Sequence, residues 1–310
     1  MSSQNLAVKR FTHDWLIRFV ELHPIETYFD NYLLGSARYG PEQSPFDKIS
    51  PYFSNLLQRY MPDIINPCNV QFKENDLFLK PNIEDDDEAE QFPFPPGNGK
   101  AVVIMKAMLF EDTNAGTLTK YIERRVFCID SDNTACYNSS FTPGELVYLT
   151  KHTKNGLSLY KCTLTEPVSF SAIWPLIKGL DSIELIVKNL DIDEGTKQAL
   201  LYMPCEVRAS SFTIYSSSVK EDVIMAFVEC FLNSPKFPQL FEWGMHPELR
   251  DIDFQPIGQE IKRRMKASGY VWDKHDGENM NAYISGDYGG NALIVRSADK
   301  VFHVLSFPRF

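Results

Sequence analysis

The sequence predicts an α+β protein with a helical N-terminal region, an antiparallel β middle, and βα repeat-like units that end in a C-terminal β hairpin. Three patterns support this fold class. Before residue 80, apolar residues recur every three or four positions, as on an amphipathic helix. After residue 100 the pattern changes to β-branched and aromatic runs separated by turn residues. From residue 174 onward, strand and helix patterns alternate, which is typical of parallel βα units.

The composition is that of a globular protein rather than a fibrous or disordered one. The chain has 310 residues, of which 44% are hydrophobic and 23% charged, and its 31 basic and 41 acidic residues give a net charge of −10. A negative surface repels phosphate backbones, so the charge disfavours nucleic acid as a partner, although a local basic face stays open. No run approaches the roughly 18 apolar residues of a membrane span. The N-terminus also lacks the apolar core of a signal peptide, so we expect no membrane partner and a cytoplasmic or nuclear location.

The helical N-terminal region is assigned to residues 1–80. A first amphipathic helix is expected over 8–22, ended by Pro24, with a second helical stretch at 25–34 and a short helix at 52–60. The apolar face of the first helix includes three residues that we take as candidate partner-binding residues: Trp15, Phe19 and Leu22. Burial of Trp15 and Phe19 in the core of the protein is the alternative interpretation.

Residues 81–100 form an acidic, proline- and glycine-rich segment that we interpret as a linker or long exposed loop. Six of its acidic residues lie between Glu84 and Glu90, and three prolines and two glycines follow between 93 and 99. Such a composition does not bury enough apolar surface to order itself. A metal-binding or partner-recruiting acidic tail is the alternative.

Residues 101–310 are assigned to one mixed β then βα domain. Its first part contains four expected strands, which turn signals such as Asn155-Gly156 separate and which would form a mainly antiparallel sheet. These strands are Ala101–Phe110, Tyr121–Asp130, Leu146–Thr150 and Leu157–Thr163.

A weak internal repeat begins after Trp174. Strand patterns start at Ile183, Phe212 and Leu240, at offsets of 29 and 28 residues, and each is followed by a helix pattern, at 196–202, 221–232 and 257–267. One strand and one crossover helix per unit predict parallel neighbouring strands. Further strand patterns end the chain, and we expect a terminal antiparallel hairpin that packs on the repeats. These patterns lie at 270–272, 280–285, 292–296 and 301–307.

One local motif suggests an enzyme. The run from Arg125 to Thr134 reads as an apolar strand that ends in Asp130-Ser131-Asp132-Asn133-Thr134, and it resembles the first motif of the haloacid-dehalogenase phosphotransferases. The resemblance implies that Asp130 is the nucleophile and Asp132 the acid or base beside Mg²⁺, with Thr150 in the place of the second motif. A metal-dependent phosphoryl-transfer or nuclease-like enzyme is therefore the alternative function. A turn rich in Asp, Ser and Asn explains the same residues without chemistry.

The other polar motifs point to structure rather than catalysis. The pairs Asp191 with Asp193 and Asp251 with Asp253 precede expected helices, where Asp is an ordinary N-cap. The cysteines and histidines do not fall at metal-ligand spacings, so we expect buried free thiols, no metal site and no cofactor. The basic run 262–266 is expected to be a solvated helix face, with a nucleic-acid patch as the alternative.

Two segments resemble the divergent nematode F-box and F-box-associated proteins. They are His13–Leu22, within the helical N-terminus, and Phe227–Lys236, which ends a repeat helix before Leu240-Phe241-Glu242. The resemblance implies a leucine-rich-repeat-like βα surface that binds another protein. We therefore expect a non-enzymatic interaction or adaptor protein, such as a substrate-recruiting component of a ubiquitin ligase or of another regulatory complex. The identity of the partner and the oligomeric state are left open.

Overall fold

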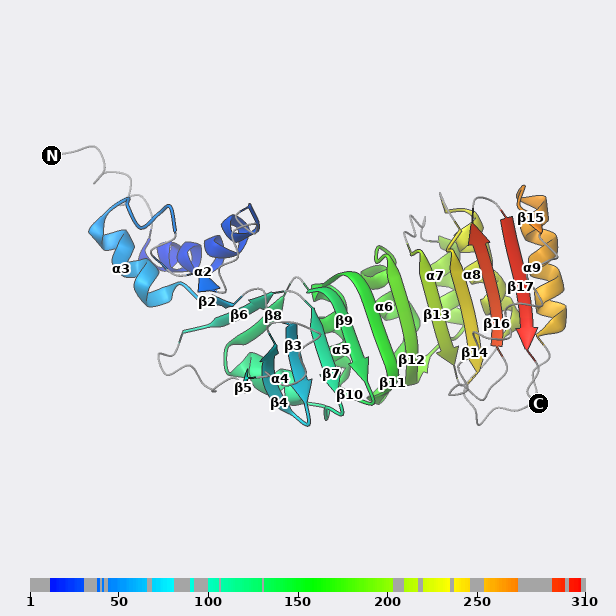
Figure 1. The fold of residues 1–310 in the computed structure, drawn as a ribbon, viewed down its shortest axis with the longest axis horizontal. Coiled ribbons are helices and arrows are strands. Elements are labelled where there is room, and N and C mark those ends of the chain that lie inside the picture. Colours follow the sequence, from blue (N-terminus) through cyan, green and yellow to red (C-terminus); the bar gives the residue numbers. More distant parts are fainter. Residues whose placement is uncertain are drawn as a thin grey trace. The chain divides into compact units, whose positions relative to one another are not determined.

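The chain folds into two compact units of helices and strands, which confirms the α+β class (Figure 1). Unit 1 comprises Met1–Leu109 and Thr117–Ser131, and unit 2 comprises Phe110–Gly116 and Asp132–Phe310. The segment 1–80 falls within unit 1, whereas 101–310 is shared between the units. The computed structural model describes residues 12–30, 38–39, 41, 44–65, 69–80, 90–91, 100–105, 107–129, 131–202, 209–216, 220–234, 237–245, 254–272, 292–298 and 301–307.

Two helices, α2 (His13–Asp30) and α3 (Pro51–Tyr60), pack together in unit 1. The expected helix at 52–60 is confirmed, and Ser50 caps it by accepting a hydrogen bond from the Phe53 backbone N–H. The expectation that Pro24 ends the first helix was wrong, because α2 continues to Asp30. The core between the helices is a cluster of apolar residues: Leu16, Val20, Phe53, Leu56, Leu57, Met61 and Val103.

Unit 1 also contains a four-stranded sheet in the order β1-β2-β6-β8. Its strands are β1 (Arg38–Tyr39), β2 (Asp63–Ile65), β6 (Val102–Met105) and β8 (Val126–Ile129). The last three are parallel, and β1 is antiparallel to β2. Strands β3 (Asn69–Lys73), β4 (Asp76–Lys80) and β5 (Glu90–Gln91) pair antiparallel. Residues 81–89 and 92–99 lie outside the described residues, so the linker stays a prediction.

The expected antiparallel β middle was wrong in three places. Strands β6 and β8 are parallel. The expected strand from Tyr121 begins instead with helix α4 (Thr117–Glu123), which precedes β8. Leu146–Thr150 belongs to α5 (Pro143–His152). Asn155-Gly156 lies inside a long strand, β11 (Thr153–Ser169), rather than in a hairpin turn.

Unit 2 is built on a mixed sheet with the strand order β15-β17-β16-β14-β13-β12-β11-β9, in which the short β10 pairs with β11. Strand β7 (Met108–Glu111) crosses from unit 1 into unit 2. The other strands are β9 (Ser131–Tyr137), β10 (Ser140–Phe141), β12 (Ser182–Asp191), β13 (Ser211–Ser216), β14 (Leu240–Met245), β15 (Val271–Trp272), β16 (Ala292–Ala298) and β17 (Val301–Phe307).

The internal repeat is confirmed. Strands β12, β13 and β14 are parallel neighbours, and Ile183, Phe212 and Phe241 are in register across them, so the repeat is 29 residues at both steps. The sequence offset of 28 was one short, because Phe241 rather than Leu240 is the residue opposite Phe212. Each strand leads into a helix. The unit 2 helices that follow β11 to β14 are α6 (Phe170–Ile177), α7 (Glu194–Tyr202), α8 (Glu221–Leu232) and α9 (Gln255–Ala267).

The C-terminal hairpin is confirmed as well. Strand β16 pairs antiparallel with β14 on one side and with β17 on the other, so the hairpin extends the sheet beyond the last repeat strand. The expected strand at 280–285 lies outside the described residues.

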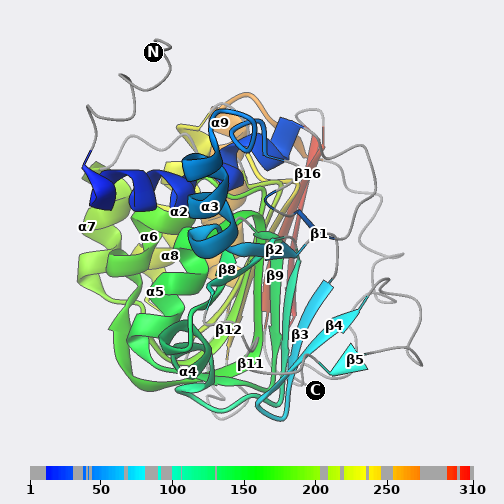
Figure 2. The ribbon, with the colours of Figure 1, turned by 90° about the vertical axis from the view of Figure 1, so that its left-hand side faces the viewer.

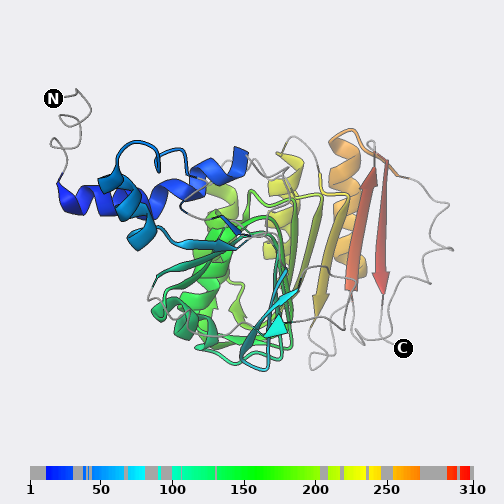
Figure 3. The same ribbon diagram turned by 60° about the vertical axis from the view of Figure 1, so that its left-hand side comes forward.

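The helices of unit 2 cover one face of its sheet. Figures 2 and 3 show α5, α6, α7 and α8 on the same side of β11 and β12. The core between helices and sheet is aromatic: the Phe227 ring of α8 lies 5.2 Å from Phe212 and 5.4 Å from both Phe170 and Trp243, centroid to centroid. Aromatic pairs at these separations stabilise a core beyond the area they bury.

Candidate partner-binding surface

The three N-terminal candidates occupy different environments in unit 1. The Trp15 ring stacks on Phe19 at 5.4 Å and is 46% exposed, and Leu22 is 60% exposed. Phe19 packs edge-on against Phe46 at 5.3 Å. Phe19 therefore packs against the core of the protein, as the alternative interpretation predicts, while Trp15 and Leu22 expose apolar surface to solvent. A partner for them stays a prediction.

The candidate catalytic residues do not form a described site. Asp130 lies outside the described residues, and the side chain of Asp132 is exposed on β9. Thr150 is buried inside α5, where its hydroxyl donates to the Val147 carbonyl at 3.0 Å, so the comparison with a second phosphotransferase motif at a strand end was wrong. Within the described ranges, no group of three or more His, Cys, Asp or Glu side chains is placed to hold a metal ion.

Asp193 caps α7, as the N-cap interpretation predicts. Its Oδ1 accepts the Thr196 backbone N–H at 3.1 Å, and the Thr196 hydroxyl accepts the Asp193 N–H at 3.2 Å. Asp251 and Asp253 lie outside the described residues.

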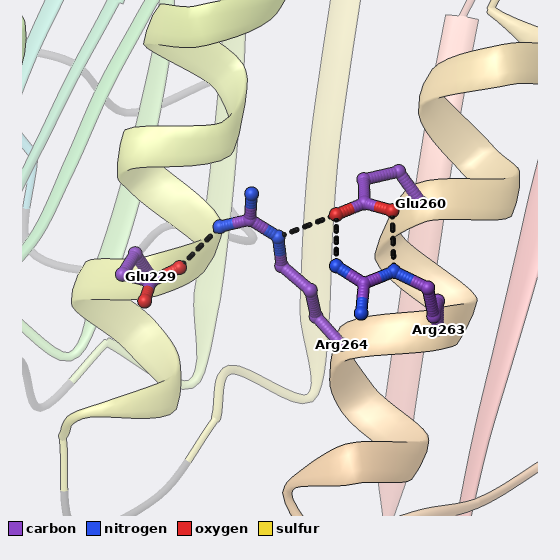
Figure 4. A network of polar contacts seen from close by, with 4 residues as sticks. All are labelled: Glu229, Glu260, Arg263 and Arg264. Carbon is purple, nitrogen blue, oxygen red and sulfur yellow. Dashed lines mark hydrogen bonds and ion pairs between the residues drawn. The ribbon is translucent and has the colours of Figure 1, made fainter.

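The basic face of α9 is engaged within the protein (Figure 4). Arg263 donates two hydrogen bonds to Glu260, at 2.7 and 2.6 Å, and Arg264 joins Glu260, at 2.9 Å, to Glu229 of α8. Hydrogen bonds from the two guanidinium groups lower the pKa of Glu260 to about 2. The network therefore ties α9 to α8.

The two lysines of the same basic run contact an aromatic ring. Lys262 and Lys266 place their Nζ atoms 4.6 and 5.0 Å from the centre of the Trp272 ring. All four cationic side chains of residues 262–266 thus have partners within unit 2.

A surface groove of about 610 Å³ lies on the outer side of α7 and α8. Met225 and Ala226 are its buried apolar part. Lys197 lines the groove and donates a hydrogen bond to Asp222 at 2.9 Å. Arg264 also lines the groove and pairs with Glu229 (Figure 4). Ion pairs within the protein therefore neutralise much of the charge in the groove.

The opposite face of the repeat sheet is the strongest candidate for a binding surface. Phe212 and Phe241 point to the helices, because their rings contact Phe231 of α8 at 5.3 and 5.4 Å. Side chains alternate along a strand, so the intervening positions face the other way. No helix among the described residues of unit 2 covers them in the views of Figures 2 and 3.

We call this face the open face. Its central row is in register across five strands and consists of Ser158, Glu184, Thr213, Glu242 and Ile294. The next row toward the carboxyl ends of the parallel strands contains Ile186, Tyr215 and Gly244, and the row on the other side contains Ser182, Ser211 and Leu240.

Hydroxyl groups hold the two carboxylates of the open face. The Ser158 hydroxyl donates to Glu184 from the neighbouring strand, and the Tyr215 hydroxyl donates to Oε1 of Glu242 at 2.7 Å. Both glutamates are partly exposed.

Aromatic side chains lie beside this row on β9 and β11. The rings of Tyr137 and Tyr160 are 6.0 Å apart, and Lys161 places its Nζ 5.1 Å from the centre of the Tyr160 ring. Burial, and then the negative charge of Glu184, raise the pKa of Tyr137. Tyr137 therefore lies close enough to Glu184 to share its electrostatic environment.

The open-face residues were missed by the sequence interpretation, although a signal for them exists. Aligning the repeats at 29 residues places Glu184, Thr213 and Glu242 at one equivalent position. The strands were recognised from their apolar positions alone, which identify the core face.

The described cysteines are buried free thiols, as expected. Burial raises the pKa of Cys128 to about 12 and that of Cys162 to about 11, so these thiols stay protonated at neutral pH. The helices within the described residues include none that is both long and apolar enough to cross a bilayer. Comparison with family models, curated proteins and solved structures finds no match to this chain.

Proposed function

We propose that the chain is a non-enzymatic interaction protein that binds another protein through the open face of unit 2. One observation carries the proposal: helices cover one face of a regular βα sheet, and the other face presents partly exposed polar side chains in register. Stacked repeats expose a continuous surface of this kind, which repeat proteins use for binding. The resemblance to F-box-associated proteins supports the same class of function.

A narrower role rests on that resemblance alone. It would make the chain an adaptor that recruits a substrate to a ubiquitin ligase or to another regulatory complex, with α2 as a second contact through Trp15 and Leu22. Both side chains offer apolar surface to a partner. The buried free thiols fit the reducing cytoplasm or nucleus in which such a complex works.

The test blocks the open face without changing its charge. In a Ser182→Tyr/Ser211→Tyr protein, two bulky, strand-compatible side chains stand where Ser182 is exposed and Ser211 partly exposed. Proteins recovered by affinity purification from native cells are compared between this variant and the wild type. We expect at least one specific partner to be lost from the variant.

The matched control is Gln198→Tyr, which adds the same side chain at an exposed position of α7 on the helical side. It should retain every partner. Circular dichroism and thermal unfolding verify that all proteins fold. Retention of all partners by the folded open-face variant would contradict the proposal.

A further inference from the structure

The basic run 262–266 of α9 has four positive side chains, and its two arginines use the acidic side chains nearby. Arg263 pairs with Glu260, which also accepts a hydrogen bond from Arg264. Arg264 in turn reaches Glu229 of α8. Both carboxylates are thus bound to arginines (Figure 4), and none of the salt bridges that the described residues of α9 make involves a lysine.

The charges of Lys262 and Lys266 are therefore not compensated within the described part of the chain. Their Nζ atoms lie 4.6 and 5.0 Å from the centre of the Trp272 ring. An indole ring attracts a cation through its π electrons but carries no net charge. Burial, and then the positive charge of Lys266, lower the pKa of Lys262, because the two ammonium groups repel each other. An anion between the two lysines would remove that repulsion.

The two lysine side chains are also held in position. Lys262 and Lys266 are four residues apart on α9 and therefore lie on the same side of the helix. Both extend to one aromatic ring, and a side chain that is fixed in advance loses less entropy on binding. Lys266 is exposed and Lys262 partly exposed, so a ligand can reach them. The pair thus has the charge, the position and the access that an anion needs.

The number of available charges limits what the anion is. Clusters that bind anionic lipid headgroups contain about four to eight lysines or arginines. Binding of a nucleic acid likewise adds contacts to several phosphates. Two ammonium groups are too few for either, because the net charge of −10 repels a large polyanion. One phosphate monoester, which carries about −1.5 to −2 charges at pH 7, matches two lysines.

We propose, building on the interaction function proposed above, that Lys262 and Lys266 bind the phosphate group of a phosphorylated side chain in a partner protein. Each Nζ atom donates a hydrogen bond to a phosphate oxygen, and the Trp272 ring keeps the two lysines in place. Phosphorylation of the partner then regulates how tightly it binds to unit 2.

The direct test uses a short capped peptide that carries one phosphoserine and no other charged residue. Its binding to the full chain is measured by calorimetry at low salt, and the unphosphorylated peptide is titrated in parallel. We expect only the phosphorylated peptide to bind. In Lys262→Gln/Lys266→Gln its Kd should rise about fivefold or more, because two charge-assisted hydrogen bonds to the phosphate are lost.

The charge-matched control is Lys151→Gln/Lys220→Gln, which removes two exposed lysines of unit 2 outside α9. Its Kd should change less than about twofold, since distant surface charges are screened. Circular dichroism verifies that both variants fold. An equal rise of the Kd in both variants would show that only the net charge attracts the phosphopeptide. That result, or equal binding of the two peptides by the wild type, overturns the proposal.

Two further ligands test the class of partner. A single-stranded oligonucleotide and vesicles that contain an anionic lipid are titrated against the same proteins. We expect both to bind the wild type more weakly than the phosphopeptide does. If either binds more tightly and loses affinity in Lys262→Gln/Lys266→Gln, the ligand of these lysines is a nucleic acid or a membrane, and the proposal is wrong.

This inference and the proposed function fail separately. If Lys262→Gln/Lys266→Gln keeps its affinity for the phosphopeptide while Ser182→Tyr/Ser211→Tyr loses a native partner, the interaction function stands and the phosphate site is wrong. If the tyrosine variant keeps every partner while the lysine variant loses the phosphopeptide, the phosphate site stands and the open face is not the binding surface.

Discussion

The ring of Tyr215 lies directly over the backbone of Gly244, its register partner on the next strand. A Cβ atom at Gly244 would fall 2.1 Å from Cε1 of Tyr215, which is far inside contact distance. This position lets the tyrosine hydroxyl reach Glu242 at 2.7 Å. A glycine in the strand therefore supports the position of one of the two carboxylates on the open face.

Gly244→Ala should destabilise unit 2 by about 1–3 kcal/mol, the typical cost of forcing extra volume into a packed site. The added methyl group displaces the Tyr215 ring and breaks its hydrogen bond to Glu242. Urea unfolding measures the loss. In a Tyr215→Ala background the same change should cost less, because the clash is gone, and equal costs in both backgrounds would contradict the contact.

The Glu145 side chain joins two segments of unit 2. It is 2% exposed, and its Oε2 accepts the N–H of Thr142 at 3.0 Å and that of Gly116 at 2.9 Å. Glu145→Ala leaves both donors without this acceptor and should lower the free energy of unfolding by about 1–3 kcal/mol. Glu145→Gln keeps an oxygen acceptor and should cost less. A smaller loss for alanine than for glutamine in urea unfolding would contradict this role.

The same helix shows why the β middle was mispredicted. Leu146 to Thr150 has the β-branched and aromatic residues of a strand, but Thr142 and Glu145 form a capping box with Pro143 in the first turn. That signal was present in the sequence and outweighs the strand propensity of the residues after it.

Gly156 was misread for a different reason. Asn-Gly predicts a hairpin turn, yet this glycine stands in β11, where a Cβ atom would lie 2.5 Å from Oδ1 of Asn133. That close neighbour is distant in sequence, so no local pattern identifies it. The repeat, by contrast, was predictable because the apolar residues of β12 to β14 and α8 recur at short, regular spacings.

Glu260 should make stability depend on pH in the acid range. Hydrogen bonds from Arg263 and Arg264 lower its pKa from 4.5 to about 2 in the folded state. A lowered pKa contributes stability above pH 4.5, and that contribution is lost as the pH falls from 4.5 toward 2. Thermal unfolding between pH 6 and pH 3 should therefore show a steeper loss for the wild type than for Glu260→Gln.

The control for this pH dependence is Glu166→Gln, a charge-matched change at an exposed position of β11. It should leave the acid slope of the unfolding temperature close to that of the wild type. A wild-type slope in the Glu260→Gln protein would show that the network of Figure 4 does not stabilise the fold.

Arg125 adopts a backbone conformation that favours glycine. Its φ is 64°, just after α4, where its N–H donates to the Ile122 carbonyl at 2.9 Å. Left-handed geometry costs a non-glycine residue about 1–2 kcal/mol. The guanidinium lies 3.6 Å from Glu21, an exposed pair whose contribution is at most about 1 kcal/mol.

Arg125→Gly should therefore raise the free energy of unfolding by about 0.5–1 kcal/mol, since relief of strain exceeds the entropy that glycine adds to the unfolded chain. Arg124→Gly is the matched control: its N–H bonds to Lys120 and Tyr121 within the helix end, so glycine should cost about 0.5–1 kcal/mol there. Urea unfolding of the two variants should give opposite signs. If both variants are destabilised, the contacts of the Arg125 side chain contribute more to stability than relief of its backbone strain does. Those contacts would then hold the left-handed conformation of Arg125 in place.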